Sequence, residues 1–335
     1  MRVLAIESSC DESAVAVLDG ESRCFTHEFI SSQAAVHRQF GGVVPDLAGK
    51  EHRRALPELI GRWQCSDSFA VPDMIAVTHG PGLACALGAG LDVARELATF
   101  YQCPLLGINH LQGHALSPFI PLWQRNQPWS DLFPHLGLLV SGGNTLLFTI
   151  DENFNKQVLA ETVDDAAGEA LDKGARMLGL PYPGGPPMEE LAREGNPKAY
   201  NFPRAFTPAV MKFSFSGLKT ALLYQLRKMQ ADEIAQYKAD LCSSYLQAIC
   251  DALVRKVDHV AKELEPRSIG FSGGVSQNCV LRGEMEAVCS RRNVPLLLTP
   301  RPYCGDNASM IAFAAMVDGC HGEKSPTRFH PKLRL

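Results

Sequence analysis

One order of short apolar runs and helical segments occurs twice along this chain of 335 residues. In each half three strand-like runs come first, and helix, strand, helix, strand and helix follow them. The strands expected in the first half span residues 2–7, 14–18, 24–31, 74–78 and 104–109, with helices over 45–63, after the turn at 80–82 and from 110. Those expected in the second half span 136–141, 145–151, 157–162, 268–272 and 295–298, with helices over 164–179, 233–265, from 276 and over 307–317. A duplicated βββαβαβα order predicts an α/β protein of two related domains.

The length of the chain agrees with this division, because domains average roughly 150 residues. We expect an N-terminal half over residues 1–130 and a C-terminal half over 131–305, joined by a segment at 123–134 that is rich in Pro, Asn, Gln and Trp. An insertion dense in Pro and Gly occupies about 182–216. The final helix and tail, 306–335, are predicted to close an interdomain nucleotide cleft.

Composition excludes several classes of protein. The chain has 32 Lys and Arg against 36 Asp and Glu, a net charge of −4, which excludes a uniformly basic nucleic-acid coat but not a local basic patch. No apolar stretch approaches the roughly 18 residues of a membrane span, and the N-terminus lacks the apolar core of a signal peptide. The eleven cysteines contain no C-x-x-C pair, which is typical of reduced thiols. We therefore expect a cytoplasmic protein without a membrane partner.

Small-residue turns follow the first strand of each half at corresponding places. They are Ser8-Ser9-Cys10-Asp11 and Ser141-Gly142-Gly143-Asn144, and a third turn, Gly273-Gly274, follows the strand at 268–272. Backbone N–H groups in such turns form concave anion sites, because glycine lets the main chain approach a phosphate closely. Most glycine-rich turns bind nothing, but their repetition favours a clamp for a nucleotide.

The motif His110-Leu111-Gln112-Gly113-His114 places two imidazoles four residues apart, on one face of a helix. Such a pair can bind one metal ion, and it can equally be two unrelated surface histidines. Zinc proteases with a similar pair need a Glu directly after the first His, where this chain has Leu111. Asp306, at the start of the last helix, is our candidate for a third ligand; its alternative is a plain N-cap.

Two groups of carboxylates have alternative interpretations. Asp165, Glu169 and Asp172 share one side of a predicted helix that Asp164 caps. They are a solvated face, or the carboxylate at the end of the stripe accepts hydrogen bonds from a ribose. Asp11 and Glu12 follow the first strand, so they are either loop caps or catalytic groups.

Nine strings in order along the chain complete a recognisable pattern. They are IESSCDES at 6–13, GGVVP at 41–45, GPGL at 80–83, HLQGH at 110–114, LVSGG at 139–143, DDAAGEA at 164–170, YPGGP at 182–186, FSFSGLKT at 213–220 and GGVSQN at 273–278. With them the chain resembles the TsaD family, the tRNA N6-adenosine threonylcarbamoyltransferases. The resemblance implies two duplicated domains of the RNase H-like, actin-like ATPase fold.

The resemblance also implies a metal, a nucleotide substrate and the residues that hold them. One divalent metal per subunit, iron or zinc, would be held by His110, His114 and Asp306. Threonylcarbamoyl-adenylate would lie along Leu139, Val140, Ser141, Gly142, Gly143 and Asn144, and its adenosine would contact Asp172, Gly185, Glu189 and Asn278. Asn144 stands where bacterial members usually have His, and Leu139 where the archaeal and eukaryotic branch has a metal-binding Tyr. Neither optional ligand is therefore present.

The implied reaction transfers the threonylcarbamoyl group from threonylcarbamoyl-AMP to N6 of the adenosine 3′ to the anticodon of ANN-decoding tRNAs, which gives t6A and AMP. Asp11 or Glu12 could accept the amine proton. Candidate tRNA contacts are Lys50, His52, Arg53, Arg54, Arg282, Arg291 and Arg292. If the chain is bacterial, the implied partners are TsaB-, TsaE- and TsaC-like proteins. The alternatives are a small-molecule kinase of the same fold, a metalloprotease, and a non-catalytic TsaB-like scaffold.

Overall fold

A computed structural model describes residues 1–207, 210–319 and 322–335 of the chain. By their contacts these residues divide into two compact units, one of Met1–Trp129 with Pro300–Leu335 and one of Ser130–Thr299. The last helix and the tail thus fall in the first unit, and their role in closing a cleft remains a prediction.

The first unit is built on a six-stranded sheet in the order β12-β5-β4-β1-β2-β3. Its strands are β1 (Arg2–Glu7), β2 (Glu12–Asp19), β3 (Cys24–Ser32), β4 (Met74–Gly80), β5 (Leu105–Asn109) and β12 (Glu323–Lys324). β1 runs antiparallel to β2 and parallel to β4. The interior residues of β1 and β2 are buried, because helices cover both faces of the sheet.

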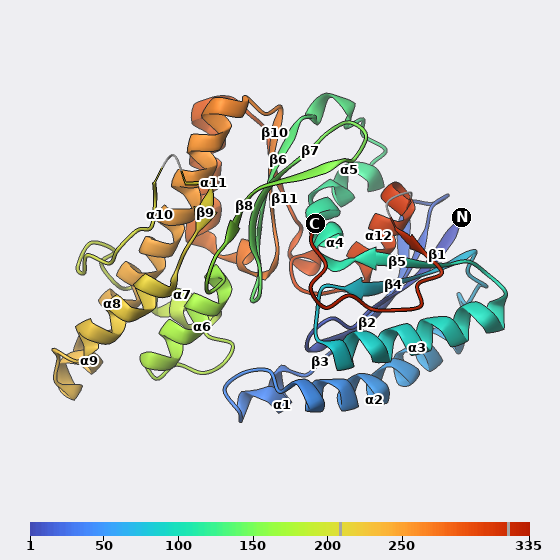
Figure 1. Cartoon of the computed structure of the whole chain (residues 1–335), viewed down its shortest axis with the longest axis horizontal. Helices are drawn as coiled ribbons and strands as arrows, with labels where there is room; N and C mark the ends of the chain where they lie inside the picture. Colours follow the sequence, from blue (N-terminus) through green and yellow to red (C-terminus); the bar gives the residue numbers. More distant parts are fainter. Residues whose placement is uncertain (208–209, 320–321) are drawn as a thin grey trace. The chain divides into compact units, whose positions relative to one another are not determined.

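Two long helices, α2 (Pro45–Gln64) and α3 (Ala84–Tyr101), lie side by side on one face of this sheet (Figure 1). Leu56 and Trp63 of α2 and Leu91 of α3 pack there against Leu4 and Ile6 of β1. The opposite face carries α12 (Ala308–Asp318), which packs against α4 (His110–Leu116). The remaining helices of the unit are short: α1 (Ala34–Arg38), η1 (Ser117–Phe119), α5 (Ile120–Gln124) and η4 (Arg301–Tyr303).

The second unit repeats the arrangement with the sheet order β11-β10-β6-β7-β8-β9. Its strands are β6 (His135–Val140), β7 (Thr145–Ile150), β8 (Lys156–Thr162), β9 (Lys212–Phe213), β10 (Ser268–Ser272) and β11 (Leu296–Leu298). Without the two-residue strands β12 and β9, both sheets have the same order, with the first three strands antiparallel and the other two added in parallel. The predicted duplication is confirmed.

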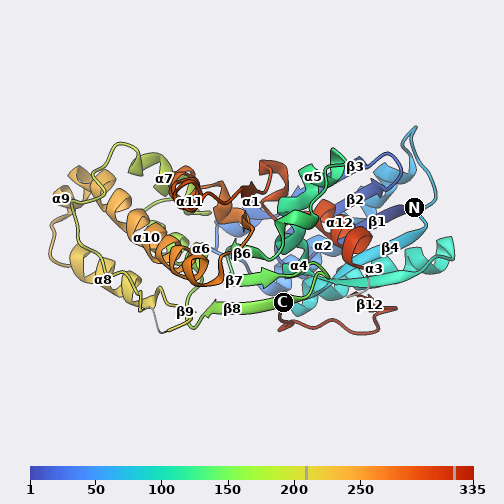
Figure 2. The same cartoon turned by 90° about the horizontal axis from the view of Figure 1, so that it is seen from above.

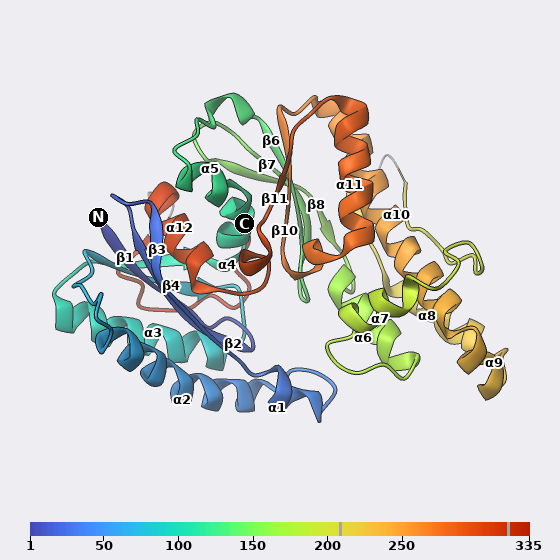
Figure 3. The same cartoon turned by 180° about the vertical axis from the view of Figure 1, so that it is seen from behind.

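In the second unit α10 and α11 lie next to each other (Figure 3), and the described part of this unit contains eight helical segments. They are η2 (Ser130–Leu132), α6 (Ala167–Met177), α7 (Gly185–Ala192), α8 (Ser216–Leu226), α9 (Ala231–Gln236), α10 (Lys238–Leu264), η3 (Gly274–Gln277) and α11 (Cys279–Arg292). The core of the unit gathers Leu136, Leu138, Tyr245, Leu253 and Phe271. Among the described helices, none combines the length and apolar character needed to cross a lipid bilayer.

Two predictions about helices were wrong. The single helix expected over 233–265 is two helices: α9 starts at a capping box of Gln230 and Glu233, and α10 starts after Tyr237. The helix expected from Asp164 begins at Ala167, and its N-cap is Ala166. The Asp164 carboxylate instead accepts hydrogen bonds from the Ser214 hydroxyl and the Phe215 main-chain N–H, at 2.5 and 2.7 Å.

Candidate active site and metal centre

Two histidines project from α4, directly after β5. Asn109 caps this helix, because its side chain accepts a hydrogen bond from the Leu111 N–H at 2.8 Å. His110 and His114 are one helical turn apart and almost wholly buried. Their ring centroids lie 4.7 Å apart with the rings perpendicular. The alternative of two unrelated surface histidines is therefore wrong.

Asp306 approaches both imidazoles from the start of α12. Its Oδ1 lies 3.1 Å from Nε2 of His114 and 3.5 Å from Nε2 of His110. The N-cap of α12 is Asn307, whose side chain accepts from the Met310 N–H at 2.9 Å. Asp306 is therefore not the N-cap, and its carboxylate contacts the two histidines instead.

Gly113 allows α4 and α12 to approach closely. A Cβ at this position would lie 3.0 Å from side-chain atoms of Met310 and Ile311. A side chain at this position would require Met310 and Ile311 of α12 to shift by a few tenths of an ångström.

Glu7, at the end of β1, is a member of this cluster that the sequence analysis missed. Its Oε2 lies 3.1 Å from Nδ1 of His110, and its Oε1 accepts from the Ser9 N–H at 2.6 Å. The Thr78 hydroxyl also donates to Glu7 Oε2. The carboxylate is fully buried, and a Glu that ends an apolar strand is the signal that could have revealed it.

The charges in the cluster are strongly coupled. Burial alone would lower the pKa of His110, but the negative charges of Glu7 and Asp306 raise it to about 9. Burial opposes ionisation of Asp306 as well, yet the two histidines lower its pKa to about 2. Burial lowers the pKa of His114. Without a metal, the cluster therefore holds one imidazolium between two carboxylates.

The donor atoms fit a small divalent cation. Nε2 of both histidines and a carboxylate oxygen of Asp306 lie within 4.8 Å of one another. Ligands 2.0–2.2 Å from a tetrahedral metal are separated by about 3.3–3.6 Å, which compares with 3.1 and 3.5 Å from Asp306 to the two rings. Glu7 contacts the opposite nitrogen of His110, which is where metal-binding histidines usually find their second carboxylate.

The two candidate catalytic carboxylates occupy the turn between β1 and β2. Asp11 lies in the turn, where its main-chain oxygen accepts from the Gln33 N–H at 2.9 Å. Glu12 begins β2 and accepts from the Ser32 hydroxyl at 3.1 Å. Burial first, and then the charges of Asp306 and Asp11, raise the pKa of Glu12 to about 9.

The second unit contains the residues expected along the substrate. The turn after β6 closes on itself, because the Ser141 N–H donates to the Asn144 oxygen at 2.8 Å and the Asn144 N–H donates to Ser141 Oγ at 3.1 Å. Gly142 and Gly143 between them are exposed, with open space where a Cβ would be. Gly168 of α6 packs against this turn, since a Cβ there would lie 2.4 Å from the Ser141 oxygen.

Leu139 and Val140 precede this turn within β6, and their side chains are fully buried. Only main-chain atoms of these two residues are therefore open to a substrate role.

The four residues expected around adenosine lie in two places, and a hydrogen bond is found at each. Asp172 accepts a hydrogen bond from the Gly184 N–H at 2.7 Å. The next residue, Gly185, starts α7, and a Cβ built on it would meet no atom within 4 Å. Glu189 accepts from the side-chain amide of Asn278 at 2.9 Å. Asn278 also caps α11. The fold thus connects α6 with α7, and α7 with the start of α11.

Other candidate residues have structural roles. Asp165 and Glu169 are paired with Lys173 at 2.7 and 2.8 Å, so the acidic stripe is partly neutralised. His52 is fully buried and lies 2.7 Å from Ser13 Oγ, so it does not belong to a surface patch. Arg292 is paired with Asp258 at 2.9 Å.

Comparison with known proteins identifies the family of this chain. The sequence profile of TsaD, tRNA N6-adenosine threonylcarbamoyltransferase, matches residues 25–313. The chain belongs to the TsaD family. A curated relative of that name from Moorella thermoacetica is 42% identical over 316 residues, which cover 93% of this chain and 90% of the relative. Another, from Fervidobacterium nodosum, is 40% identical over 339 residues, with 99% and 97% covered. The chain is therefore an acyltransferase of a metal-dependent family.

Solved structures show the same fold in more distant proteins. Full-length HypF in a phosphate- and nucleotide-bound form has a TM-score of 0.61 at 12% identity, over 98% of this chain and 47% of HypF. The activator of 2-hydroxyisocaproyl-CoA dehydratase from Clostridium difficile has a TM-score of 0.51 at 14% identity, over 94% and 93%. The predicted duplicated actin-like fold is confirmed.

Proposed function

We propose that the chain transfers the threonylcarbamoyl group from threonylcarbamoyl-AMP to N6 of the adenosine 3′ to the anticodon in ANN-decoding tRNAs, and releases AMP. The observation that carries this proposal is the buried group of His110, His114 and Asp306, in a chain of the TsaD family. A kinase or a scaffold of the same fold has no evident use for such a group.

The chemistry calls for positioning more than for covalent catalysis. Threonylcarbamoyl-AMP is a mixed carbamic–phosphoric anhydride, so AMP leaves readily. The adenosine amine is a weak nucleophile, because its lone pair is delocalised into the ring. The rate therefore depends on holding the amine near the carbonyl and on stabilising negative charge there.

The metal proposed for this group is iron, with zinc as the alternative, since two imidazoles and a carboxylate suit either ion. When bound, it would supply a Lewis acid or a template for the substrate. The residues of the chain would orient the ligands. Glu7 contacts Nδ1 of His110, and Gly113 leaves room for α12, which follows Asp306.

The proposed base is Asp11 or Glu12, which would accept the proton that the amine loses. In the metal-free chain Glu12, with its pKa of about 9, is protonated at neutral pH. A cation on Asp306 would offset the negative charge that contributes to this shift, and would favour the carboxylate form. Burial, the largest cause of the raised pKa of Glu12, would remain, so the proposal keeps Asp11 as the alternative base.

The second unit is proposed to bind the adenylate. The exposed N–H groups of Gly142 and Gly143 are suited to bind phosphate or carbonyl oxygen. Asp172, Gly185, Glu189 and Asn278 would contact the adenosine. We place no substrate contact on the side chains of Leu139 and Val140, since both are buried.

The tRNA and partner proteins are proposed to share a surface. The chain has a net charge of −4, and Lys50, Arg53 and Arg291 are exposed cations that could contact tRNA. TsaB- and TsaE-like proteins could complete a tRNA surface, and a TsaC-like synthase would make the adenylate. All ten cysteines in the described part of the chain are free thiols, which suits the cytoplasm.

Single-turnover transfer tests this function. Threonylcarbamoyl-AMP and an ANN-decoding tRNA are mixed with wild type, with H110A/H114A and with H259A, and t6A is measured by nucleoside mass spectrometry. His259 is a matched control, because it pairs with Glu263 and packs against Phe206, neither of which belongs to the proposed site. We expect product from wild type and H259A and none from the double variant. No product from wild type, even with partner proteins added, would overturn the transferase function.

A further inference from the structure

A second cluster of metal-binding side chains, which shares no residue with the group on α4, lies where the C-terminal tail crosses the first unit. The tail begins at β12, which pairs antiparallel with β5 through Glu323 and Gly107. The Ser325 N–H continues the pairing by donating to the Leu105 oxygen at 2.8 Å. Figure 2 shows the tail, in dark red, leaving β12 and ending at the C label.

The tail returns to the end of β4 seven residues after β12 begins. The His330 N–H donates to the His79 oxygen at 2.6 Å, and the Gly82 N–H donates to the Pro331 oxygen at 3.2 Å. Gly80 has φ +155°, and a Cβ on it would lie 2.0 Å from the His330 oxygen. Only glycine therefore allows the tail to lie against β4 at this place.

Three ligand side chains converge as a result. Nε2 of His79 lies 3.3 Å from Oε2 of Glu323, and Nε2 of His330 lies 3.4 Å from the same oxygen. All three ligand atoms lie within 4.8 Å of one another, and the two rings are perpendicular. Both distances fall in the range of about 3.3–3.6 Å that separates the ligands of a tetrahedral metal.

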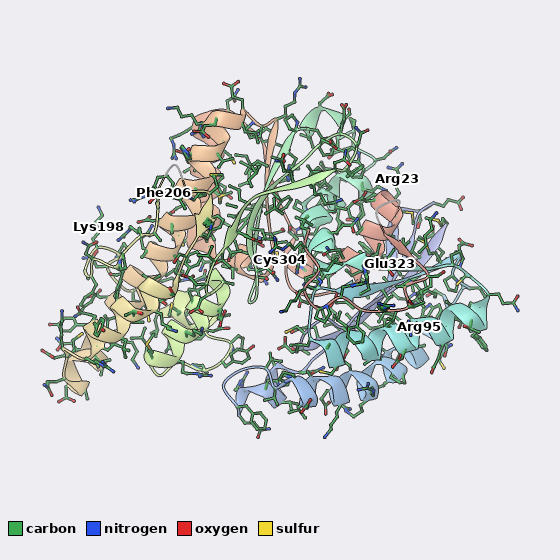
Figure 4. The ribbon with its side chains drawn as sticks, in the orientation of Figure 1. Arg23, Arg95, Lys198, Phe206, Cys304 and Glu323 are labelled. Atoms are coloured by element: carbon green, nitrogen blue, oxygen red, sulfur yellow. The ribbon has the colours of Figure 1, made fainter. Side chains whose placement is uncertain are left out.

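We propose that His79, Glu323 and His330 bind a divalent transition metal ion, for which Zn²⁺ is the probe, and that this ion fastens the tail to β4. The donor set of two imidazoles and a carboxylate is a known zinc set that leaves a fourth position for water. His79 is 7% exposed, whereas Glu323 and His330 are 42% and 44% exposed, so an ion can enter from solvent. Figure 4 labels Glu323 on the tail and Arg95 on α3, whose guanidinium donates to the Pro326 oxygen at 3.1 Å.

An ordinary ion pair is the alternative explanation. His259 and Glu263 provide the comparison within the same chain, since their closest atoms are also 3.4 Å apart. That pair has no third ligand among the described residues, whereas the tail cluster has three from separate segments. The proposal shares no residue with the group on α4, so the two sites can be tested independently.

Zinc content of the full-length protein, measured by mass spectrometry after gel filtration in Zn²⁺, tests the proposal. In an H110A/H114A background we expect one retained zinc per chain, none after adding H330A or E323Q, and one after adding H259A as the control. In the wild-type background, H330A should lower the zinc content by one ion per chain. This comparison still tests the proposal if H110A/H114A does not fold. Equal zinc content with and without H330A in both backgrounds would overturn the proposal.

Tail protection is a second measurement. Trypsin cleaves after Arg328 and Lys332, which are exposed in the tail. If Zn²⁺ binds only the fastened tail, a concentration of 100 times Kd should slow this cleavage about 100-fold in H110A/H114A. The same addition should have no effect once H330A is present. Cleavage that is indifferent to zinc in H110A/H114A would contradict the site.

Discussion

Glu7 Oε2 lies 3.1 Å from Nδ1 of His110, while the other nitrogen of the same ring faces Asp306 at 3.5 Å. One imidazole is thus held between a carboxylate fixed in β1 and a carboxylate at the start of α12. This arrangement orients Nε2 toward the proposed metal and makes the ring a better ligand. Glu7 is therefore a positioning residue, because it acts through His110.

Above pH 9, where no proton on His110 competes with the metal, the substitution E7Q should weaken metal binding about 10–100-fold, because it removes the charge behind His110. The affinity is measured by competition with a coloured chelator, and the pKa of His110 by NMR should fall below its wild-type value of about 9. S13A is the control, since it removes the hydroxyl beside the buried His52 in the same unit. Wild-type metal affinity in E7Q would contradict this role.

Metal affinity should increase with pH from about 6 to 9. The metal must displace the proton that Glu7 and Asp306 hold on His110, whose pKa is about 9. Metal titrations at several pH values should show that the logarithm of the affinity rises by one per pH unit, as expected for one proton released per metal. In E7Q this rise should end at a lower pH. A flat profile below pH 9 would show that His110 is not a ligand.

The metal-free chain should lose thermal stability as the pH rises. Glu12 and His110 have folded pKa values of about 9, whereas their ordinary values are 4.5 and 6.5. The stability that each protonated group contributes is therefore lost as the pH rises from its ordinary pKa to about 9. Asp306, with a pKa of about 2, stabilises the fold more as the pH rises. This contribution no longer changes above about pH 4.

Tm in the presence of a chelator measures this effect. In E12Q the fall in Tm should be confined to about pH 6.5–9, because His110 is then the only one of the two groups that still titrates. A wild-type Tm that rises from pH 6.5 to 9 would contradict the assigned charges.

The substitution G168A should impair transfer without removing the metal. Its Cβ would lie 2.4 Å from the Ser141 oxygen and 2.9 Å from Gly142 Cα, so the proposed adenylate turn must shift, at a cost of about 1–3 kcal/mol in the free energy of unfolding. Denaturation, single-turnover transfer and metal content are measured together. G217A is the control: it meets open space in α8 and should stabilise by about 0.4–1 kcal/mol. Unchanged transfer in G168A would exclude the turn from the site.

Much of the fold could be predicted because hydrophobic periodicity is a local property. The strand at 2–7 and the start of the helix at Pro45 agree with the structure. The division at Tyr237 was missed because no side-chain cap marks it: α10 starts there without a side-chain cap hydrogen bond. The final helix was placed within one residue at each end.

The candidate site was less accessible to sequence reasoning, because burial and pairing depend on distant segments. His52 looked like part of a basic helix face, yet it shares the buried face of α2 with Ala48, Ala55 and Leu59. Asp164 looked like a cap, but residues 50 positions later use its carboxylate. Glu7 shows its role only when β1 and α4 are placed together.

Asp306 comes 192 residues after His114 in the chain, although the two side chains are 3.1 Å apart. The whole second unit, Ser130–Thr299, is synthesised between them. At about 5–20 residues per second, the ribosome needs about 10–40 s to supply the last ligand after the histidines. During that interval the nascent chain carries an incomplete pair of imidazoles, so selective metal loading must wait until translation has passed Asp306.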